Sequence, residues 1–221
     1  MSLKGLDAVF VTHEHADHVN GLGVLARKQD VPLYMTRDTF SSLPEKVGVL
    51  PRLVFFEAGD SVEVGDLAVA SFSVAHDAAD PVSYTVESAE GVRIGFATDL
   101  GHSSHLVRTR LAACHALVLE ANYCPELLLR SAYPPKVRQR IQSRTGHLSN
   151  QDMSSLLHQL LHDGLQLVVL FHVSENNNEY DRAQKMAQGV LRNHPARLHV
   201  ARQDTPTPVF EVVSSETRLL S

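Results

Sequence analysis

The chain of 221 residues contains no tryptophan and only two cysteines, Cys114 and Cys124. Their spacing fits neither a metal or redox motif nor a disulfide framework, which favours a reducing, cytoplasmic setting. No apolar run is long enough to predict a membrane span, so we expect no membrane partner. The net charge of −5 gives no overall attraction to nucleic acid, and any such contact requires a local basic patch.

Histidine, by contrast, is abundant, with 13 residues in the chain. Three of them lie within six residues in the segment His13-Glu14-His15-Ala16-Asp17-His18, directly after an apolar run at residues 6–11. An apolar run that ends in His and Asp predicts a buried strand that delivers ligands to the edge of a sheet. Imidazole and carboxylate together form the ligand set that suits Zn, Mn or Fe.

Three further apolar segments end in the same way, at His76, Asp99 and His172. A single histidine at a strand end is more often a solvated or capping residue than a ligand. Four such segments in one chain reverse that expectation, because strand ends at one edge of a sheet converge in space. The sequence therefore predicts one multi-ligand metal site.

The remaining pattern predicts an α/β (α+β) protein with helices on the outer faces of its sheets. We expect strands at residues 6–12, 31–35, 53–56, 61–64, 67–74, 82–88, 92–98, 116–121, 165–171, 197–201 and 209–213. We expect helices at residues 20–28, 37–45, 103–113, 125–131, 135–143, 150–162 and 180–192. With no internal repeat, low-complexity segment or long linker, residues 1–221 are expected to form one domain.

The ligand pattern resembles that of the metallo-β-lactamase superfamily, in the order His-x-His-x-Asp-His, His, Asp, His. The resemblance implies an αββα sandwich that holds two divalent metal ions, Zn or Mn, with Fe as a further option. It places one metal on three histidines, His13, His15 and His76. It places the other on Asp17, His18 and His172, with Asp99 as the bridge between the two.

Shorter segments are similar to the YycJ/WalJ (VicX) group of that superfamily. They include residues 76–81, 97–101, 120–122, 146–150 and 172–177. The resemblance implies a cytoplasmic phosphodiesterase or nuclease, of the 5′→3′ DNA exonuclease kind, in which a metal-bridging hydroxide attacks phosphorus. It implies a nucleic acid partner, with DNA favoured over RNA, and dimers are common in the superfamily.

Asp17 and His147 are the expected catalytic residues. His147 precedes a predicted helix whose first amides offer an anion site, and its imidazole could contact the scissile phosphate or protonate the leaving oxygen. Two alternative roles for His147 stay open. It could only cap the loop, or it could take the place of His172 as the last metal ligand. The expected substrate contacts are Ser149, Asn150, Arg138 and Arg140. A solvated helix face explains the two arginines nearly as well.

Two departures from the group are expected to matter. The strands that normally precede the first motif and carry Asp-Ala-Gly are absent, so the first sheet should expose an edge. Asn122-Tyr123-Cys124 stands where relatives are expected to have Asn-His-Asp. Two rival functions stay open, a thioester or lactone hydrolase of the same fold and a non-catalytic, metal-stabilised regulatory module.

Overall fold

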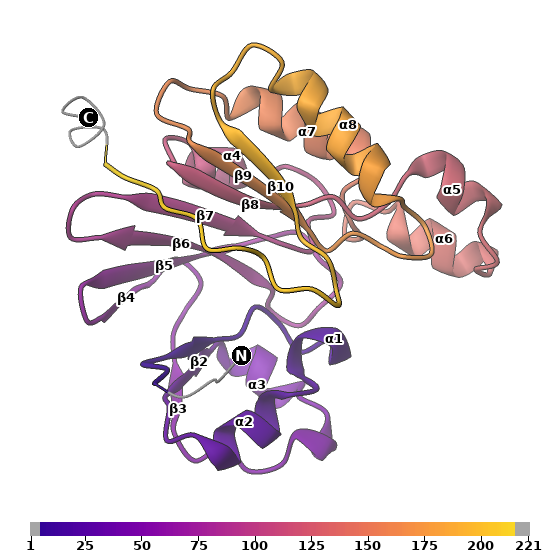
Figure 1. The fold of residues 1–221 in the computed structure, drawn as a ribbon. Coiled ribbons are helices and arrows are strands. Elements are labelled where there is room, and N and C mark those ends of the chain that lie inside the picture. The colour runs from indigo at the N-terminus through magenta and orange to yellow at the C-terminus, as the bar shows by residue number, and fades with distance from the viewer. Residues whose placement is uncertain (1–4, 215–221) are drawn as a thin grey trace.

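Two β-sheets lie face to face in the computed structural model, which describes residues 5–214 (Figure 1). The smaller sheet is parallel and contains β1 (Val9–Phe10), β2 (Leu33–Met35) and β3 (Leu53–Phe55) in that order. The larger sheet has the order β10-β9-β8-β7-β6-β5-β4. Its strands are β4 (Ser61–Val64), β5 (Leu67–Ser73), β6 (Val82–Ser88), β7 (Arg93–Ala97), β8 (Ala116–Glu120), β9 (Leu167–Phe171) and β10 (Arg197–Val200).

The larger sheet combines an antiparallel and a parallel half. Strands β4 to β7 form an antiparallel meander, with left-handed Gly65 and Gly91 in two of its turns. Strands β7 to β10 are parallel, and each connection between them carries a helix. Because β5 and β7 run in the same direction as β8 and β9, the C-terminal ends of all four share one edge.

Helices cover the outer faces of both sheets (Figure 1). The small sheet is flanked by α1 (Ala16–Val19), α2 (Leu22–Lys28), α3 (Arg37–Ser41) and the 3-10 turn η1 (Glu45–Val47). The large sheet carries α4 (His105–Leu111), α7 (Asn150–Gln159) and α8 (Tyr180–Val190). The short helices α5 (Pro125–Arg130) and α6 (Pro135–Ile141) project beyond one edge of the large sheet. The αββα sandwich implied by the sequence resemblance is thus confirmed.

Three apolar layers hold the sandwich together. Leucines of α7 and β8 dominate the layer between the outer helices and the large sheet. A second layer lies between the small sheet and α2. Between the sheets, Phe56, Val82 and Tyr84 pack with Phe10 and Tyr34. The buried hydroxyl of Tyr84 also donates to the carbonyl oxygen of Val11 at 2.6 Å, which ties the large sheet to the segment that enters the histidine motif.

Most of the predicted elements are present near their expected bounds, and three predictions were wrong in detail. The first strand comprises only residues 9–10, and α1 follows it unpredicted inside the histidine motif. The helix expected at residues 37–45 ends at Ser41. Residues 209–213 form no strand; the side chain of Gln166 bonds both backbone groups of Val213 instead.

Two further expectations concern exposed surfaces. Within residues 5–214, β1 pairs only with β2 and is therefore an open edge of the small sheet, as expected. No helix among the same residues is long and apolar enough to cross a membrane.

Candidate metal centre

All the ligand-type residues predicted from strand ends meet at one edge of the sandwich, between the two sheets. The loop after β1 carries His13, the loop after β5 carries His76, and Asp99 and His172 follow β7 and β9. These strands differ widely in sequence position but end at the same edge, so the chain needs only short loops to bring the residues together.

Three histidines form the first cluster. One potential ligand atom from each of His13, His15 and His76 lies within 4.8 Å of the others. The Nε2 atom of His76 is 3.1 Å from Nδ1 of His15. The other ring nitrogen of His76 contacts the carbonyl oxygen of Gly146 at 3.0 Å, which fixes the proton on Nδ1 and leaves Nε2 free to bind a cation.

A second cluster contains Asp17, His18 and His172, again with ligand atoms within 4.8 Å of one another. The Nε2 atom of His172 lies 3.4 Å from Oδ2 of Asp17, and Nε2 of His18 lies 3.6 Å from the same oxygen. Asp17 and His18 come from α1, so this unpredicted turn of helix brings both side chains to the second cluster, where the ring centroid of His18 also lies 4.1 Å from that of His13.

Asp99 lies between the two clusters and turns one oxygen to each. Its Oδ1 is 3.6 Å from Nε2 of His76, and its Oδ2 is 3.2 Å from Nε2 of His18. Thr98 donates a hydrogen bond to Oδ2 at 2.5 Å. Although burial opposes ionisation, the hydrogen bond from His18 and the nearby imidazoles hold the pKa of Asp99 well below its usual value. The buried carboxyl is therefore an anion that faces both groups.

Strained and closely packed backbone brings these side chains into place. Asp99 and His172 both have a φ of +54°, and this left-handed conformation turns the chain sharply at the end of each strand. Gly101 and Gly146 permit close contact between loops. A Cβ atom on Gly101 would lie 2.1 Å from the carbonyl oxygen of Arg144, and one on Gly146 would lie 2.2 Å from that of Ile141. The loop that carries His147 is thus packed directly against the loop that carries Asp99.

Glu120 is a buried member of the site that the sequence prediction missed. It is fully buried, and its Oε1 accepts from Nδ1 of His147 at 2.7 Å and from Nδ1 of His172 at 3.0 Å. Its Oε2 accepts from the backbone amides of Leu100 and Leu148. Since these contacts occupy both oxygens, we assign Glu120 the role of holding the two imidazoles. The sequence did contain a signal for Glu120, since it is an acidic residue at the end of an apolar strand. The same pattern identified four other site residues, His13, His76, Asp99 and His172.

The electrostatics around His172 favour a cation. Burial alone would lower its pKa, but the carboxylates of Asp17, Glu120 and Asp99 raise the pKa of His172 to about 11. Glu120 and Asp99 likewise raise the pKa of His147, again against the effect of burial. Three carboxylates that favour a proton here also favour a divalent metal ion in its place.

In the first cluster, by contrast, the pKa values of two histidines are lowered. Burial, reinforced by the neighbouring His18, lowers the pKa of His13 to about 3, and burial also lowers the pKa of His76. The Nε2 atom of His13 is buried without a hydrogen-bond partner among the described residues. A neutral, buried and unpartnered imidazole nitrogen costs free energy unless a ligand satisfies it.

The residues present fit divalent metal ions. Two ligand atoms on one tetrahedral ion, each about 2.0–2.1 Å from it, are about 3.3 Å apart. The observed separations of 3.1 Å for His15–His76, 3.2 Å for His18–Asp99 and 3.4 Å for Asp17–His172 agree with that spacing. The hydrogen bonds on the far ring nitrogens of His76 and His172 are those that orient metal-binding histidines.

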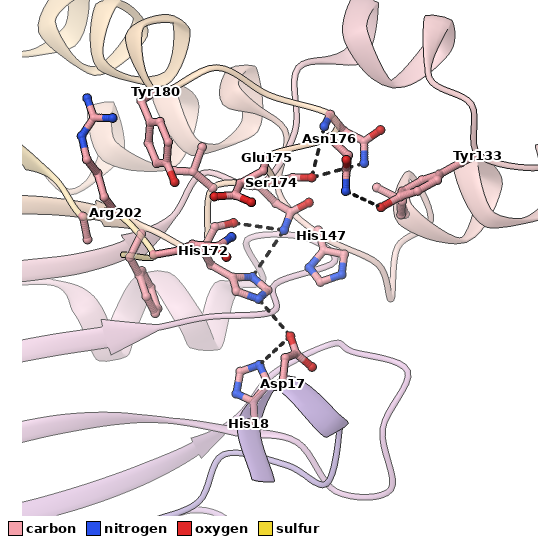
Figure 2. A pocket seen from close by; sticks show the side chains of 17 residues that line it. Asp17, His18, Tyr133, His147, His172, Ser174, Glu175, Asn176, Tyr180 and Arg202 are labelled. Carbon is pink, nitrogen blue, oxygen red and sulfur yellow. Dashed lines mark hydrogen bonds and ion pairs between the residues drawn. The ribbon is translucent and has the colours of Figure 1, made fainter. Parts of the chain in front are cut away.

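A cavity of about 700 Å³ opens beside the second cluster (Figure 2). Asp17, His18, His147 and His172 line one part of it. The side chain of Asp17 is 66% exposed, so its carboxylate faces solvent in the cavity. The structure thus places the two expected catalytic residues, Asp17 and His147, on the wall of one cavity with ligand residues of the second cluster.

The four expected substrate contacts lie elsewhere. Ser149 is buried as the N-cap of α7, where it accepts from the amide of Asp152. Asn150 is buried in reciprocal hydrogen bonds with Asn178. Arg138 donates to the carbonyl oxygen of Leu129 at 2.6 Å. None of the three lines the cavity, so we do not include them among the cavity residues that contact substrate.

Arg140, the fourth expected contact, is engaged in an ion pair. Its Nε and Nη2 donate to the carboxylate of Asp77, the residue after His76. The ring nitrogen of His76 is 3.5 Å from the same carboxylate. Glu14, between two ligands of the first motif, accepts from the amide of Ala79 at 2.9 Å. Both contacts stabilise the loop after β5 rather than face the cavity.

In the segment Asn122-Tyr123-Cys124, only Asn122 lines the cavity. Its side-chain amide donates to the carbonyl oxygen of His172 at 3.1 Å and lies 3.4 Å from Nδ1 of the same residue. Tyr123 and Cys124 are buried, and neither lines the cavity. These two positions therefore serve packing in this chain.

Comparison with known proteins agrees with this geometry. Residues 1–173 match the family model described as beta-lactamase superfamily domain. Exodeoxyribonuclease YycJ of Bacillus anthracis is 33% identical over 193 residues, which cover 86% of this chain and 73% of that protein. Exodeoxyribonuclease WalJ of Streptococcus pneumoniae serotype 2 is 32% identical over 220 residues, which cover 95% and 81% respectively.

Solved structures share the fold at lower sequence identity. The crystal structure of Zn²⁺-bound PqqB from Methylobacterium extorquens superimposes with a TM-score of 0.68 at 22% identity, over 91% of this chain and 74% of that one. At that identity the likeness speaks for the fold alone, whereas the family match and the curated relatives cover most of the chain. The chain therefore belongs to the metallo-β-lactamase superfamily, within its YycJ/WalJ group.

Proposed function

We propose that this protein is a divalent-metal-dependent phosphodiesterase that degrades DNA from the 5′ end. The observation that carries the proposal is the pair of ligand clusters with one oxygen of Asp99 turned to each. Two relatives at 32–33% identity are named exodeoxyribonucleases, which supports phosphodiester bonds of DNA as the substrate.

The first metal ion would be held by the cluster of three histidines, His13, His15 and His76. The second would be held by the cluster of Asp17, His18 and His172, and Asp99 would bridge the pair. Five imidazoles and two carboxylates are compatible with Zn or Mn, and we propose either of these as the native metal. Bound at these positions, two divalent ions would supply Lewis acidity and would lower the pKa of the attacking water toward neutrality.

The protein's own residues would bind and orient the phosphodiester around that water. Asp17, exposed in the cavity, would accept a hydrogen bond from the water and so orient it toward phosphorus. When the new P–O bond forms, the bond to the 3′ oxygen of the leaving nucleotide breaks, and that oxygen needs a proton. His147 lines the same cavity and would donate it from Nε2.

Glu120 makes His147 suitable for this role. A carboxylate only accepts hydrogen bonds, so the contact of 2.7 Å fixes a proton on Nδ1 of His147 and leaves Nε2 to face the cavity. The same contact raises the pKa of His147, so the imidazolium persists at higher pH than in water. The charge that develops on the leaving oxygen would therefore be neutralised as the bond breaks.

The test is an assay of metal-loaded protein on 5′-phosphorylated DNA and RNA, single- and double-stranded. We expect release of nucleotides from DNA by wild type and at least a hundredfold loss in His13→Ala and Asp99→Ala. Absence of release by wild type, or release by His13→Ala and Asp99→Ala at the wild-type rate, would contradict the proposal. Faster degradation of RNA would overturn the choice of DNA, and light scattering would test the homodimer that the resemblance implies.

A further inference from the structure

The cavity extends beyond the metal-ligand residues to a second wall that no part of the proposed reaction uses. Figure 2 shows Tyr180 and Arg202 on one side of His172, and Tyr133 and Asn176 on the other side, near His147. These four residues come from α8, from the segments after β10 and β9, and from the segment between α5 and α6. This polar and aromatic surface lies next to the ligand residues of the second cluster.

Arg202 is held at this wall by two contacts. The guanidinium carbon lies 4.7 Å from the centroid of the Tyr180 ring, so the cation rests on the ring face. The preceding residue, Ala201, donates its amide to the carbonyl oxygen of Leu170, which extends the parallel pairing of β10 with β9. Val200 of β10 pairs with Leu170 of β9. Arg202 and His172 each lie two residues further along the chain, just beyond the ends of these two strands, at the same edge of the sheet.

The charge of Arg202 is available to a ligand. Within residues 5–214 no carboxylate lies within ion-pair distance of its guanidinium, although the exposed Glu175 lines the same cavity. The other arginines near the site are engaged, Arg140 with Asp77 and Arg138 with a backbone carbonyl. An arginine that is stacked on a ring keeps its N–H fork in a fixed plane, and this fork matches the oxygens of a phosphate.

Tyr133 and Asn176, on the other side of His172, supply an aromatic ring and an amide that can contact a nucleoside. The amide of Asn176 donates to the hydroxyl of Tyr133 at 3.2 Å, and this places an aromatic ring and an amide side by side. Aromatic faces stack bases without regard to sequence, and amide and carboxylate groups bond their edges. The cavity volume of about 700 Å³ is within the range of small-ligand sites.

We infer that this part of the cavity is a nucleotide subsite, in which Arg202 binds the 5′-phosphate of the nucleotide whose 3′ side carries the scissile bond. The inference rests on the proposed function for the choice of a nucleic acid. Tyr180 is a positioning residue, because it holds the guanidinium rather than the phosphate. The phosphate could be the terminal monoester of a strand or an internal diester, and both present the same oxygens.

Binding of two mononucleotides that contain no phosphodiester bond isolates the contribution of Arg202. We would titrate metal-loaded protein with deoxyadenosine 3′,5′-bisphosphate and with deoxyadenosine 3′-monophosphate by calorimetry. The ratio of the two affinities reports the 5′-phosphate alone. In wild type this phosphate should improve binding about 10- to 100-fold, the range for a charge-assisted contact. Arg202→Ala should abolish the gain and leave the 3′-monophosphate affinity unchanged.

Matched variants separate recognition from packing. Arg192→Ala removes an exposed arginine outside the cavity and should retain the full gain. Tyr180→Phe keeps the ring and should also retain it, whereas Tyr180→Leu should reduce it severalfold. The inference is overturned if wild type shows no affinity gain from the 5′-phosphate, or if Arg202→Ala keeps that gain. Arg202 would then only pack on the Tyr180 ring.

Cleavage substrates distinguish the two sources of phosphate and keep the two proposals apart. A preference for 5′-phosphorylated over 5′-hydroxyl DNA that disappears in Arg202→Ala identifies the terminal phosphate. An equal fold-loss of the cleavage rate on 5′-phosphorylated and on 5′-hydroxyl DNA in Arg202→Ala identifies an internal phosphate. If no nucleic acid is cleaved but the affinity gain depends on Arg202, the subsite stands and the proposed function fails.

Discussion

Replacing Glu120 by glutamine should remove proton donation by His147 while the shape of the site is kept. In wild type, Oε1 accepts from two imidazoles and Oε2 accepts from two backbone amides. A glutamine side chain has one acceptor oxygen. If that oxygen satisfies the amides of Leu100 and Leu148, the NH₂ group faces Nδ1 of both rings, which must then give up their protons.

The cost can be estimated from these contacts. Each imidazole exchanges a charge-assisted hydrogen bond for a neutral one, a difference of about 1 kcal/mol. Two such losses come to about 2 kcal/mol, and relief of a buried charge offsets part of this. The Tm should therefore fall by no more than about 8 °C for a chain of this length. Loss of the general acid should reduce kcat about 10²- to 10⁴-fold, or about 3–5 kcal/mol in activation free energy.

The assay is cleavage of 5′-phosphorylated DNA under single-turnover conditions with saturating metal. Saturation matters because His172 shares Glu120 with His147, and loss of that support should weaken metal binding about 10- to 100-fold. The matched control is Glu90→Gln, in the exposed turn between β6 and β7, which should behave like wild type. Unchanged kcat in a folded, metal-saturated Glu120→Gln variant would refute the reasoning.

The pH dependence gives an independent readout of the same contact. Glu120 raises the pKa of His147, so wild type should lose activity only as pH rises through that raised value. In Glu120→Gln the pKa of His147 falls, and the alkaline limb of the rate profile should move to lower pH. A role of Glu120 in packing alone would lower the rate without moving this limb.

The structure supports four further predictions. Tyr84→Phe removes the hydrogen bond to Val11 and should lower stability by about 1 kcal/mol, measured by urea unfolding, whereas an unchanged midpoint would show that the bond between the sheets contributes nothing. Gly101→Ala places a Cβ atom 2.1 Å from a backbone oxygen and should reduce activity and Tm together; normal activity would contradict the close packing of the two loops. A chelator should lower the Tm, and Zn or Mn should restore it, because the buried Nε2 of His13 then regains a partner. Burial raises the pKa of Cys114 to about 11, so its thiol should resist alkylation at pH 9 until denaturant is added.

The strand-end pattern located most of the metal centre because it depends on a property that sequence expresses directly. A buried strand is apolar along its length, and the first polar residue after it lies at the sheet edge. His76, Asp99 and His172 were found in this way. Glu120 follows the same rule, but it was read only as part of a family segment, and its burial became visible only with its four hydrogen-bond donors in place.

Other features depend on contacts that sequence spacing does not encode. Arg202 and Tyr180 are 22 positions apart, and the packing of α8 against β10 brings them to one wall. The segment 209–213 has the apolar content of a strand, yet Phe210 packs on the large sheet while side-chain bonds from Gln166 hold the backbone. Likewise Ser149 and Asn150 are polar residues beside a predicted anion site, and their burial follows from local capping and from Asn178.

The most direct test of the central claim is the metal content of each ligand variant. Protein equilibrated with Zn or Mn and freed of excess metal should hold two ions per chain by elemental analysis. His76→Ala and His172→Ala should each hold one, since they disable different clusters, and Asp99→Ala should weaken both sites. One ion per chain in wild type, lost equally in His76→Ala and His172→Ala, would contradict a two-metal centre bridged by Asp99.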